Sequence, residues 1–510
     1  MSSEPNSINF SAIEDKIYEA TKLRSAHHRP GMDWLNPVEE VNQVITPSHD
    51  GLLVGPADHY NVGNLLRPHI LTRVINFSKF RCAGLVSRDL TPLGGHPIRN
   101  YGESALEMSG SQLNLVHFGG EILTQNLLSG YEEAISENDR DRLESLQEIS
   151  GGEQVTEFIR KRTGQLDDLA YVLAGEGEFH GSPISFHAIS LSNPSDLPEE
   201  RRNRMFSLLR GAAFVGIRDE TGANYLEEEG IEVTRMPCAL SVLPQVGARQ
   251  LRECRDERAL EEMRSRFPNG WIAIEISGIQ EEEESKLKAA LATIAERERL
   301  GLVFFHALSD TPVAECHELR RWVESFPEWS AAAFPSKKIW EVASFLLHSR
   351  LYCGSDLDSR MICMSGGVAR ISLPDRTSST QSYCELWEHD DVPIEFDEEE
   401  DWSEALLEAL NVDLSTLQQH ANQLHAQYFS ALEKFCDATG LNPRLIPAKG
   451  QTAHERASHQ LHHLHDEWLT DEEGIRAFRK LNRRSAGSKM RGFVRNAIGR
   501  DRLRKTAQKG

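Results

Sequence analysis

Short apolar runs of strand length alternate with amphipathic helical stretches through the first half of the chain. The runs are Gly51–Gly55, Ala83–Ser87, Leu113–Phe118, Ile184–Leu191, Ala212–Arg218 and Ile231–Pro237. Helical stretches such as Asn64–Ser78 and Pro198–Arg210 separate them. Alternation of this kind is typical of βαβ units, in which helices cover both faces of a parallel sheet. The pattern therefore predicts an α/β domain.

A second set of the same kind follows a charged helix at Arg249–Phe267. Its predicted strands are Trp271–Ser277, Gly301–Leu308, Arg350–Gly354 and Val368–Leu373, and its predicted helices are Glu281–Arg299, Cys316–Phe326 and Lys338–His348. We therefore predict two Rossmann-like α/β domains, at residues 46–245 and 246–385, that face each other across a cleft. Small-molecule sites favour such domain interfaces.

The two ends of the chain differ from this pattern. Residues 1–45 have no sustained apolar period and are predicted to form an N-terminal extension. Residues 386–510 are predicted to form a helical region, with helices at Trp402–Leu410 and Leu414–Cys436, followed by a basic tail. Five histidines lie within His454–His465, and they could bind a metal ion if the segment is helical. A solvated polar segment with adventitious metal affinity is the favoured interpretation.

Composition and charge narrow the class of protein and its partners. No apolar run reaches 18 residues and no signal peptide opens the chain, so we expect a cytoplasmic protein. The eight cysteines form no CxxC, which favours structural thiols over a zinc site. The net charge is −22, yet Arg476–Gly510 holds 13 Lys and Arg and one acid. This tail could contact an anionic membrane surface or the acidic patch Glu395–Asp401, whereas the acidic body disfavours nucleic acid.

An Arg-Asp pair ends one of the predicted buried strands. Arg218 and Asp219 follow the apolar run that starts at Ala212. Ligands of open α/β sheets bind in the crevice beyond the carboxyl ends of the strands. The planar guanidinium group matches carboxylates and phosphates. Arg218 is therefore a candidate for binding an anionic substrate group, and a surface ion pair with Asp219 is the alternative.

Two other strand ends in the first predicted domain carry glycine and polar residues. Asn64 lies where a helix begins, so it is predicted to contribute to an anion site at the helix amino terminus, with helix capping as the alternative. Gly119, Gly120 and Glu121 follow another strand. Paired glycines allow a ligand to approach the backbone closely, although they also serve ordinary tight turns. All four residues are substrate-binding candidates.

The second predicted domain offers a histidine and two acids. His306 is a candidate catalytic acid or base, with a structural histidine held by a loop carbonyl as the alternative. Ser355 is a natural N-cap for the helix that carries Asp356, Asp358 and Arg360. That structural role is sufficient to explain the acids, because carboxylates favour a helix amino terminus. As functional candidates, Ser355 and Arg360 bind substrate, while Asp356 and Asp358 act in catalysis. No resident cofactor is predicted, although the two acids could alternatively bind Mg²⁺.

Taken together, these motifs resemble the polysaccharide pyruvyl transferase family over about residues 48 to 375. The sequence has Asn61-Val-Gly-Asn64 where the family has a similar Asn-x-Gly-Asp, and Gly119-Gly120-Glu121 follows the third strand. Arg218 and Asp219 stand at the site of the family's anion-binding Arg, and Gly367-Val-Ala replaces a typical Gly-Val-Pro. The resemblance implies two Rossmann-like halves, as in glycosyltransferases of the B type. It also implies transfer of the enolpyruvyl carbons of phosphoenolpyruvate onto a glycan sugar as a ketal.

The sequence departs from the family at the donor site. The family's Arg-Leu-His, which contacts anionic groups of the donor, falls on Asp356-Leu357-Asp358, and Cys238 stands where the family usually has Asp. Two like charges ~4 Å apart repel by roughly 4 kcal/mol at an effective dielectric constant near 20. A triply charged donor should therefore be rejected unless Arg218, Arg360 or Lys337 compensates.

Three functional hypotheses stay open from the sequence. The first is a pyruvyl transferase-like enzyme that modifies a cell-surface glycan, such as an exopolysaccharide or its precursor, with a small-molecule donor. The second is a glycosyltransferase that uses a nucleotide sugar. The third is a non-catalytic binding or scaffold subunit of a glycan assembly complex. The sequence assigns neither the donor and acceptor nor the oligomeric state.

Overall fold

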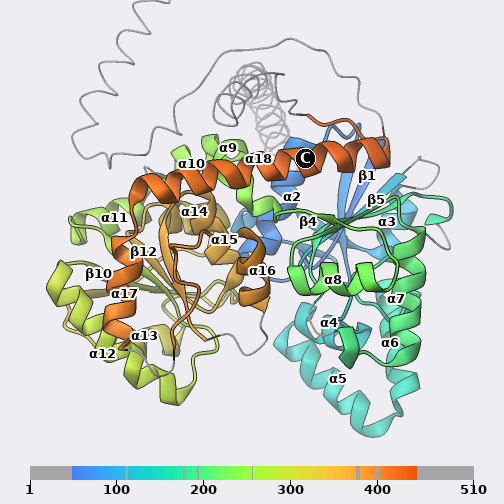
Figure 1. Ribbon diagram of the computed structural model, residues 1–510. Coiled ribbons are helices and arrows are strands. Elements are labelled where there is room, and N and C mark those ends of the chain that lie inside the picture. The colour runs from blue at the N-terminus through green and yellow to red at the C-terminus, as the bar shows by residue number, and fades with distance from the viewer. Residues whose placement is uncertain are drawn as a thin grey trace, which may run out of the picture.

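The computed structural model describes residues 49–108, 113–175, 179–191, 194–255, 257–374, 379–397 and 401–444. The predicted N-terminal extension, the His-rich segment and the basic tail lie outside these residues, so membrane contact by the tail stays a prediction. Within the described residues the chain forms two α/β domains, each built on a parallel sheet (Figure 1), which confirms the predicted fold class. We call them the N-domain, from Asp50 to Arg235, and the C-domain, from Ala248 to Ser372.

The N-domain sheet has eight strands among the described residues, in the order β3-β4-β2-β1-β5-β6-β7-β8. The strands are β1 (Asp50–Val54), β2 (Phe80–Gly84), β3 (Arg88–Asp89), β4 (Pro97–Asn100), β5 (Leu113–Phe118), β6 (Ile184–Ile189), β7 (Phe214–Ile217) and β8 (Thr234–Arg235). Only β3 runs antiparallel to its neighbour in this part of the chain. Every residue of β5 and β6 is buried, as expected for central strands covered on both faces.

Helices follow most of these strands. They are α2 (Val62–Val74), α3 (Tyr101–Glu107), α4 (Leu127–Ala134), α5 (Glu137–Ile149), α6 (Gly152–Thr163), α7 (Glu199–Gly211) and α8 (Glu220–Glu228), with short 3-10 turns η3 (Thr91–Leu93) and η5 (Pro194–Asp196). Asn61 caps α2 and Asp219 caps α8, because each side chain accepts a hydrogen bond from a backbone N–H in the first turn.

The C-domain sheet has five strands among the described residues, in the order β11-β10-β9-β12-β13, and its neighbouring strands run parallel. The strands are β9 (Trp271–Glu275), β10 (Gly301–Phe305), β11 (Ala331–Ala333), β12 (Leu351–Gly354) and β13 (Ala369–Ser372). The helices are α10 (Ala248–Arg255), α11 (Arg258–Arg266), α12 (Glu281–Glu298), α13 (His317–Glu324), α14 (Ile339–Leu347) and α15 (Leu357–Ser365).

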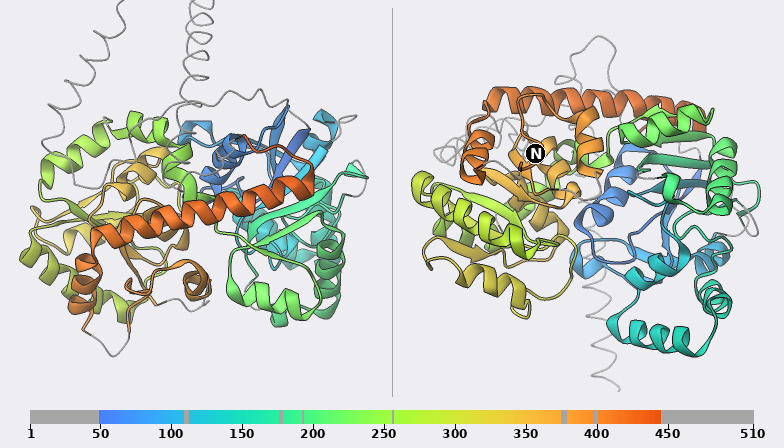
Figure 2. Two further views of the ribbon diagram at one scale, coloured as in Figure 1. Left: turned by 45° about the horizontal axis from the view of Figure 1, so that its top comes forward. Right: turned by 60° about the horizontal axis from the view of Figure 1, so that its bottom comes forward.

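Two connections join the domains. The first is η6 (Ala239–Val242) with α9 (Leu243–Val246), and the second comprises α16 (Ser379–Trp387), α17 (Trp402–Asn411) and α18 (Leu414–Thr439). Helix α18 crosses both domains in each view of Figure 2, from α15 in the C-domain to β7 in the N-domain. The ring of Phe435 lies 5.2 Å from that of Phe214, and the chain then pairs with the end of α2. Helix α18, in the helical region predicted for residues 386–510, is thus part of the contact between the domains.

One apolar cluster is continuous across the two domains. It includes Leu53 and Val116 of the N-domain sheet together with Val303 and Tyr352 of the C-domain sheet. Burial of apolar surface is the main favourable term in folding and in domain association. The relative position of the domains is therefore fixed by packing as well as by the chain connections.

The structure differs from the predicted elements in a few places. The strand predicted at Ala83–Ser87 begins and ends three residues earlier, because Asp58 accepts hydrogen bonds from the N–H groups of Leu85 and Val86 and holds them in a loop. The single predicted helix Arg249–Phe267 is two helices, α10 and α11. The short strands β3, β4 and β11 carry too few residues for an apolar period to predict them.

Candidate functional site

The sheet topology marks one point in each domain where a ligand site is expected. In the N-domain the strand order reverses between β1 and β5, and in the C-domain between β9 and β12. Ligands of open α/β sheets bind at such topological switch points, beyond the carboxyl ends of the strands. Gly119 and Gly120 directly follow β5, while Ser355 and Asp356 directly follow β12. These four sequence-predicted residues therefore lie at the switch points.

The loops at the two switch points lie against one another. The backbone N–H of Val62 donates to the carbonyl of Ala307 at 3.1 Å, and the Tyr60 hydroxyl donates to the carbonyl of Lys337 at 2.9 Å. We call this junction the seam. Its polar residues are Tyr60, Asn64, Arg67, Gly119–Glu121, Arg218, Glu275, His306, Lys337, Ser355, Asp356 and Asp358. Several of them, including Gly120, Glu121, Ser355 and Asp356, are only half-buried.

A buried ion pair between Arg67 and Asp358 crosses the seam. Arg67 lies on α2 of the N-domain and Asp358 in the first turn of α15 of the C-domain, and the guanidinium contacts both carboxylate oxygens. Burial alone would raise the pKa of Asp358, but the Arg67 and Arg218 charges outweigh it and lower that pKa. Asp358 is therefore ionised and serves as the counter-ion of Arg67. The sequence suggested this acid for catalysis, but in the structure its carboxylate is engaged in the ion pair.

Arg218 lies on the other side of the same carboxylate. Its Nη1 is 3.7 Å from Oδ1 of Asp358 and 4.0 Å from the sulfur atoms of Cys238 and Met361. Arg218 is 6% exposed, its Nε has no hydrogen-bond partner, and no oxygen among the described residues accepts a hydrogen bond from its guanidinium. Two guanidinium groups thus share one carboxylate, which leaves one positive charge in excess in a largely buried place.

The other N-domain candidates surround these two arginines. Oδ1 of Asn64 accepts a hydrogen bond from Arg67 at 2.5 Å, while Asn61 caps the helix. Asn64 therefore orients Arg67 rather than capping α2. Gly120 leaves room for Arg218, because a Cβ at this position would lie 2.9 Å from Nη2 of Arg218. Glu121 accepts a hydrogen bond from the hydroxyl of Ser190 at 2.8 Å.

The C-domain switch point holds the carboxyl groups of Glu275 and Asp356, which repel one another when both are charged. Asp356, and not Ser355 as predicted, is the N-cap of α15, with Oδ2 accepting from the backbone N–H of Ser359. The Ser355 hydroxyl instead donates to the carbonyl of Ser277 at 2.6 Å and lies 3.3 Å from Oε2 of Glu275. Burial and the charge of Asp356 raise the pKa of Glu275 to about 8, while burial and the charge of Asp358 raise the pKa of Asp356 to about 6.

His306 lies beside these acids with both ring nitrogens engaged. Nδ1 is 2.9 Å from the hydroxyl of Ser277, and Nε2 is 3.2 Å from a carboxylate oxygen of Glu318. Burial, helped by the nearby charge of Lys337, lowers the pKa of His306 to about 4. The imidazole is therefore neutral near pH 7, and its two contacts hold its orientation.

The assignment of Arg360 to substrate binding is wrong. Its fully buried guanidinium donates to Glu388 and to the carbonyls of Pro393 and Ile394. Glu388 also pairs with Arg370, and the two arginines outweigh burial and lower the pKa of Glu388 to about 2. Arg360 therefore ties α15 to the segment after α16 and does not face the seam.

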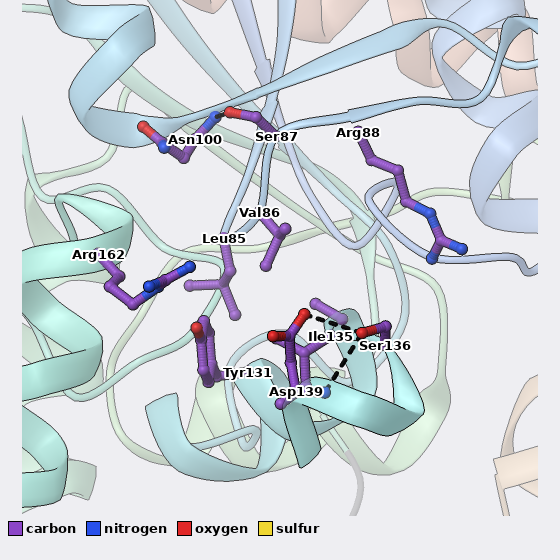
Figure 3. Close-up of a pocket in the computed structure, with 11 residues that line it drawn as sticks. Leu85, Val86, Ser87, Arg88, Asn100, Tyr131, Ile135, Ser136, Asp139 and Arg162 are labelled. Atoms are coloured by element: carbon purple, nitrogen blue, oxygen red, sulfur yellow. Dashed lines mark hydrogen bonds between the residues drawn. The ribbon is translucent and has the colours of Figure 1, made fainter. Parts of the chain in front are cut away.

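A separate cavity of about 370 Å³ opens at the ends of β2 and β4 (Figure 3). Leu85, Val86 and Ile135 form apolar parts of its lining, together with the ring of Tyr131. Arg88 and Arg162 stand on opposite sides of it in Figure 3. Arg88 also pairs with Asp310 of the C-domain at 2.9 Å, so the cavity borders the junction between the domains.

Sequence reasoning missed Arg67 and Glu275. Arg67 lies among apolar residues in the middle of helix α2, which has a second arginine near its end, and Glu275 is the one charged residue of strand β9; both are buried. Ionised side chains are almost never fully buried unless they are paired, so a charge flanked by apolar residues was the available signal. The sequence could not indicate which partner each would have.

Two further findings concern only the described residues. None of the described helices is long and apolar enough to cross a membrane. No group of three or more His, Cys, Asp and Glu side chains in the described ranges could hold a metal ion. Since Asp358 is paired with Arg67, the Mg²⁺ alternative gains no support from the geometry.

Comparison with known proteins adds similarity in fold. No family model and no curated protein matches the chain. A putative UDP-N-acetylglucosamine 2-epimerase from Listeria monocytogenes is 11% identical, with 78% of this chain and 98% of that chain covered and a TM-score of 0.45. The Methanocaldococcus jannaschii UDP-GlcNAc 2-epimerase, solved with UDP-GlcNAc and UDP, is 13% identical. The match covers 72% of this chain and 93% of that chain, with a TM-score of 0.41. The alpha,alpha-trehalose 6-phosphate synthase from Burkholderia multivorans is 10% identical. The match covers 78% of this chain and 98% of that chain, with a TM-score of 0.41. Similarities of this size assign neither a substrate nor a reaction to this chain.

Proposed function

We propose that this chain is a transferase that holds an anionic donor at Arg218 and transfers a group from it to a glycan or a glycan precursor. The observation that carries the proposal is the buried guanidinium of Arg218, for which the described residues supply no oxygen acceptor. Buried polar groups in proteins are almost always paired, so an unpaired one points to a missing partner. A carboxylate would complete Arg218 through two parallel hydrogen bonds.

Charge balance supports a carboxylate at this position rather than a more highly charged group. When Asp356 is protonated, Arg67, Arg218 and Asp358 together carry one excess positive charge, which a single carboxylate neutralises. A pyruvyl-type donor, which the sequence motifs suggest, carries such a carboxylate. The proposal therefore places the donor's carboxylate on Arg218 and its reacting carbon in the half-buried part of the seam near Gly120 and Asp356.

Asp356 is the proposed proton-transfer residue. Only its Oδ2 is used in capping α15, and its raised pKa of about 6 lies near neutral pH, where general acid–base catalysis is most effective. In a pyruvyl transfer, a proton reaches the methylene carbon of the enol, a sugar hydroxyl adds to the adjacent carbon and loses its proton, and phosphate leaves. A second hydroxyl then closes the ketal and releases the proton. Asp356 would donate the first proton and accept one from a hydroxyl.

The cavity at Tyr131 and Arg162 is the proposed acceptor subsite. It has an aromatic wall and a polar rim, a combination that suits the faces and hydroxyls of a sugar. Four strand spacings separate β2 from β7 in the sheet order, or about 19 Å at ~4.8 Å each. An acceptor that reaches from this cavity to Arg218 would therefore be an extended molecule, such as an oligosaccharide.

Donor turnover tests the proposal. The full chain would be incubated with phosphoenolpyruvate and candidate glycans, and released phosphate measured for wild type, Arg218→Met, Asp356→Asn and the exposed control Arg210→Met. We expect turnover in wild type and the control, and a loss of at least 100-fold in the other two. Turnover of nucleotide sugars instead would favour the glycosyltransferase hypothesis, and no turnover of either donor class would favour the scaffold hypothesis.

A further inference from the structure

Lys337 is a half-buried residue of the seam whose ammonium nitrogen is buried, and it belongs to the C-domain, whereas Arg218 belongs to the N-domain. It lies between β11 and α14 in the C-domain, and its backbone carbonyl accepts the hydrogen bond from Tyr60 of the N-domain. Its ammonium nitrogen lies 5.9 Å from the centre of the Tyr60 ring. Lys337 is thus held where the switch-point loops of the two domains meet.

The ammonium group of Lys337 has no acceptor in the described structure. Nζ is buried and makes no hydrogen bond there, whereas the neighbouring Lys338 is exposed and pairs with Glu341 at 2.8 Å. Removal from water lowers the pKa of Lys337, as expected for an amine that lacks a close carboxylate. The two adjacent lysines therefore differ in their surroundings. Lys338 has a partner at the surface, whereas the ammonium group of Lys337 is enclosed and has no hydrogen-bond partner among the described residues.

The acids near Lys337 do not neutralise it. Asp310 is paired with Arg88 at 2.9 Å, and Glu318 lies against His306. Glu275 has a pKa raised to about 8 by burial and by Asp356, so it is largely protonated at neutral pH. None of these three acids therefore forms an ion pair with Lys337.

We propose that Lys337 binds the phosphoryl group of a donor whose carboxylate is bound by Arg218. This inference rests on the proposed function and narrows the donor to molecules that carry a phosphate and a carboxylate as separate groups. The flexible four-carbon stem lets the ammonium turn toward a ligand, and a compact ammonium suits a phosphate dianion as a point charge. The two cations would then orient the donor across the seam, with Asp356 on the same side as the phosphate.

Ligand-induced thermal stabilisation of the full chain tests this inference. The ligands would be inorganic phosphate and pyruvate, each against potassium chloride of equal ionic strength, with wild type, Lys337→Met, Lys338→Met and Arg218→Met. We expect Lys337→Met to weaken the apparent affinity for phosphate at least tenfold while leaving the effect of pyruvate intact. Arg218→Met should do the reverse, and Lys338→Met should behave as wild type.

The two proposals fail in different ways in this experiment. Phosphate stabilisation that survives Lys337→Met overturns the assignment of Lys337, even if pyruvate still depends on Arg218. Pyruvate stabilisation that survives Arg218→Met contradicts the proposed function, even if phosphate depends on Lys337. Lys337→Arg, which keeps the charge, should retain phosphate binding, so a folding defect in the Met variant would not hide the result.

Discussion

Arg67 of the N-domain and Asp358 of the C-domain form a buried ion pair that joins the two domains at their shared switch-point loops. The sequence suggested that two acids in place of Arg and His would repel an anionic donor. The structure shows that one of these acids is neutralised by an arginine from the other domain. Arg67 and Arg218 together therefore balance the charges of Asp356 and Asp358, so this part of the seam is not strongly negative.

Removing one partner of this pair should be strongly destabilising. Asp358→Asn leaves Arg67 buried without its counter-ion, and loss of one member of a buried pair costs about 3–5 kcal/mol. Arg67→Met should cost a similar amount, and the double variant Arg67→Met/Asp358→Asn less than the sum of the single changes. Urea unfolding of the four proteins checks this. Additive costs would show that the two side chains do not interact.

Arg218→Met should leave the stability of the unliganded protein at least as high as that of wild type. The described residues give the Arg218 guanidinium no oxygen acceptor, so its removal breaks no strong contact. Arg360→Met is the matched contrast, because it strands buried Glu388 beside a single arginine and should cost about 3–5 kcal/mol. Thermal unfolding without ligand distinguishes the two. A large loss of stability in Arg218→Met would mean that this arginine is structural.

Glu275 should make the protein less stable as the pH rises from about 5 to about 8. Its folded pKa is raised to about 8 from an ordinary value of 4.5, so the folded state binds the proton more tightly than the unfolded state. This stability is complete below the unfolded pKa and is lost as pH rises through the folded pKa, with a size of about a few kcal/mol. Glu275→Gln should lack this pH dependence in urea unfolding. An identical pH profile for both proteins would contradict it.

Substitutions in the cavity of Figure 3 should weaken binding of the acceptor and leave binding of the donor unchanged. Arg162→Ala removes a guanidinium from its rim and should raise the KM for the acceptor about tenfold while leaving the KM for the donor unchanged. The neighbouring Lys161, which is exposed and pairs with Glu157, provides the control Lys161→Ala. Steady-state kinetics with each substrate varied in turn checks this. An increase in both KM values would place the cavity outside an acceptor subsite.

The fold could be predicted because strand and helix periods alternate clearly in both domains. Strand β10, Gly-Leu-Val-Phe-Phe, is an unbroken apolar run of strand length, as expected for a strand that is covered on both faces. The rule that ligands bind beyond strand ends also led to Arg218 and Asp358, which the structure places 3.7 Å apart. Their roles in binding a ligand stay proposals.

The partners of buried charges could not be predicted, because they depend on tertiary contacts between distant segments. Arg360 and Asp358 are two residues apart on one helix. Arg360 pairs with Glu388, which follows α16, whereas Asp358 pairs with Arg67 in the other domain. Residues two positions apart on a helix do not share a face. The motif around α15 therefore contained one structural and one interdomain residue that sequence alone treated alike.

The most direct test of the central claim, that Arg218 holds an anionic donor group in the seam, is calorimetric titration of pyruvate and phosphoenolpyruvate into the protein. We predict saturable binding to wild type and to Arg210→Met, and at least tenfold weaker binding, about 1.4 kcal/mol, to Arg218→Met. Equal binding by Arg218→Met, or no saturable binding of either anion by wild type, would contradict the account.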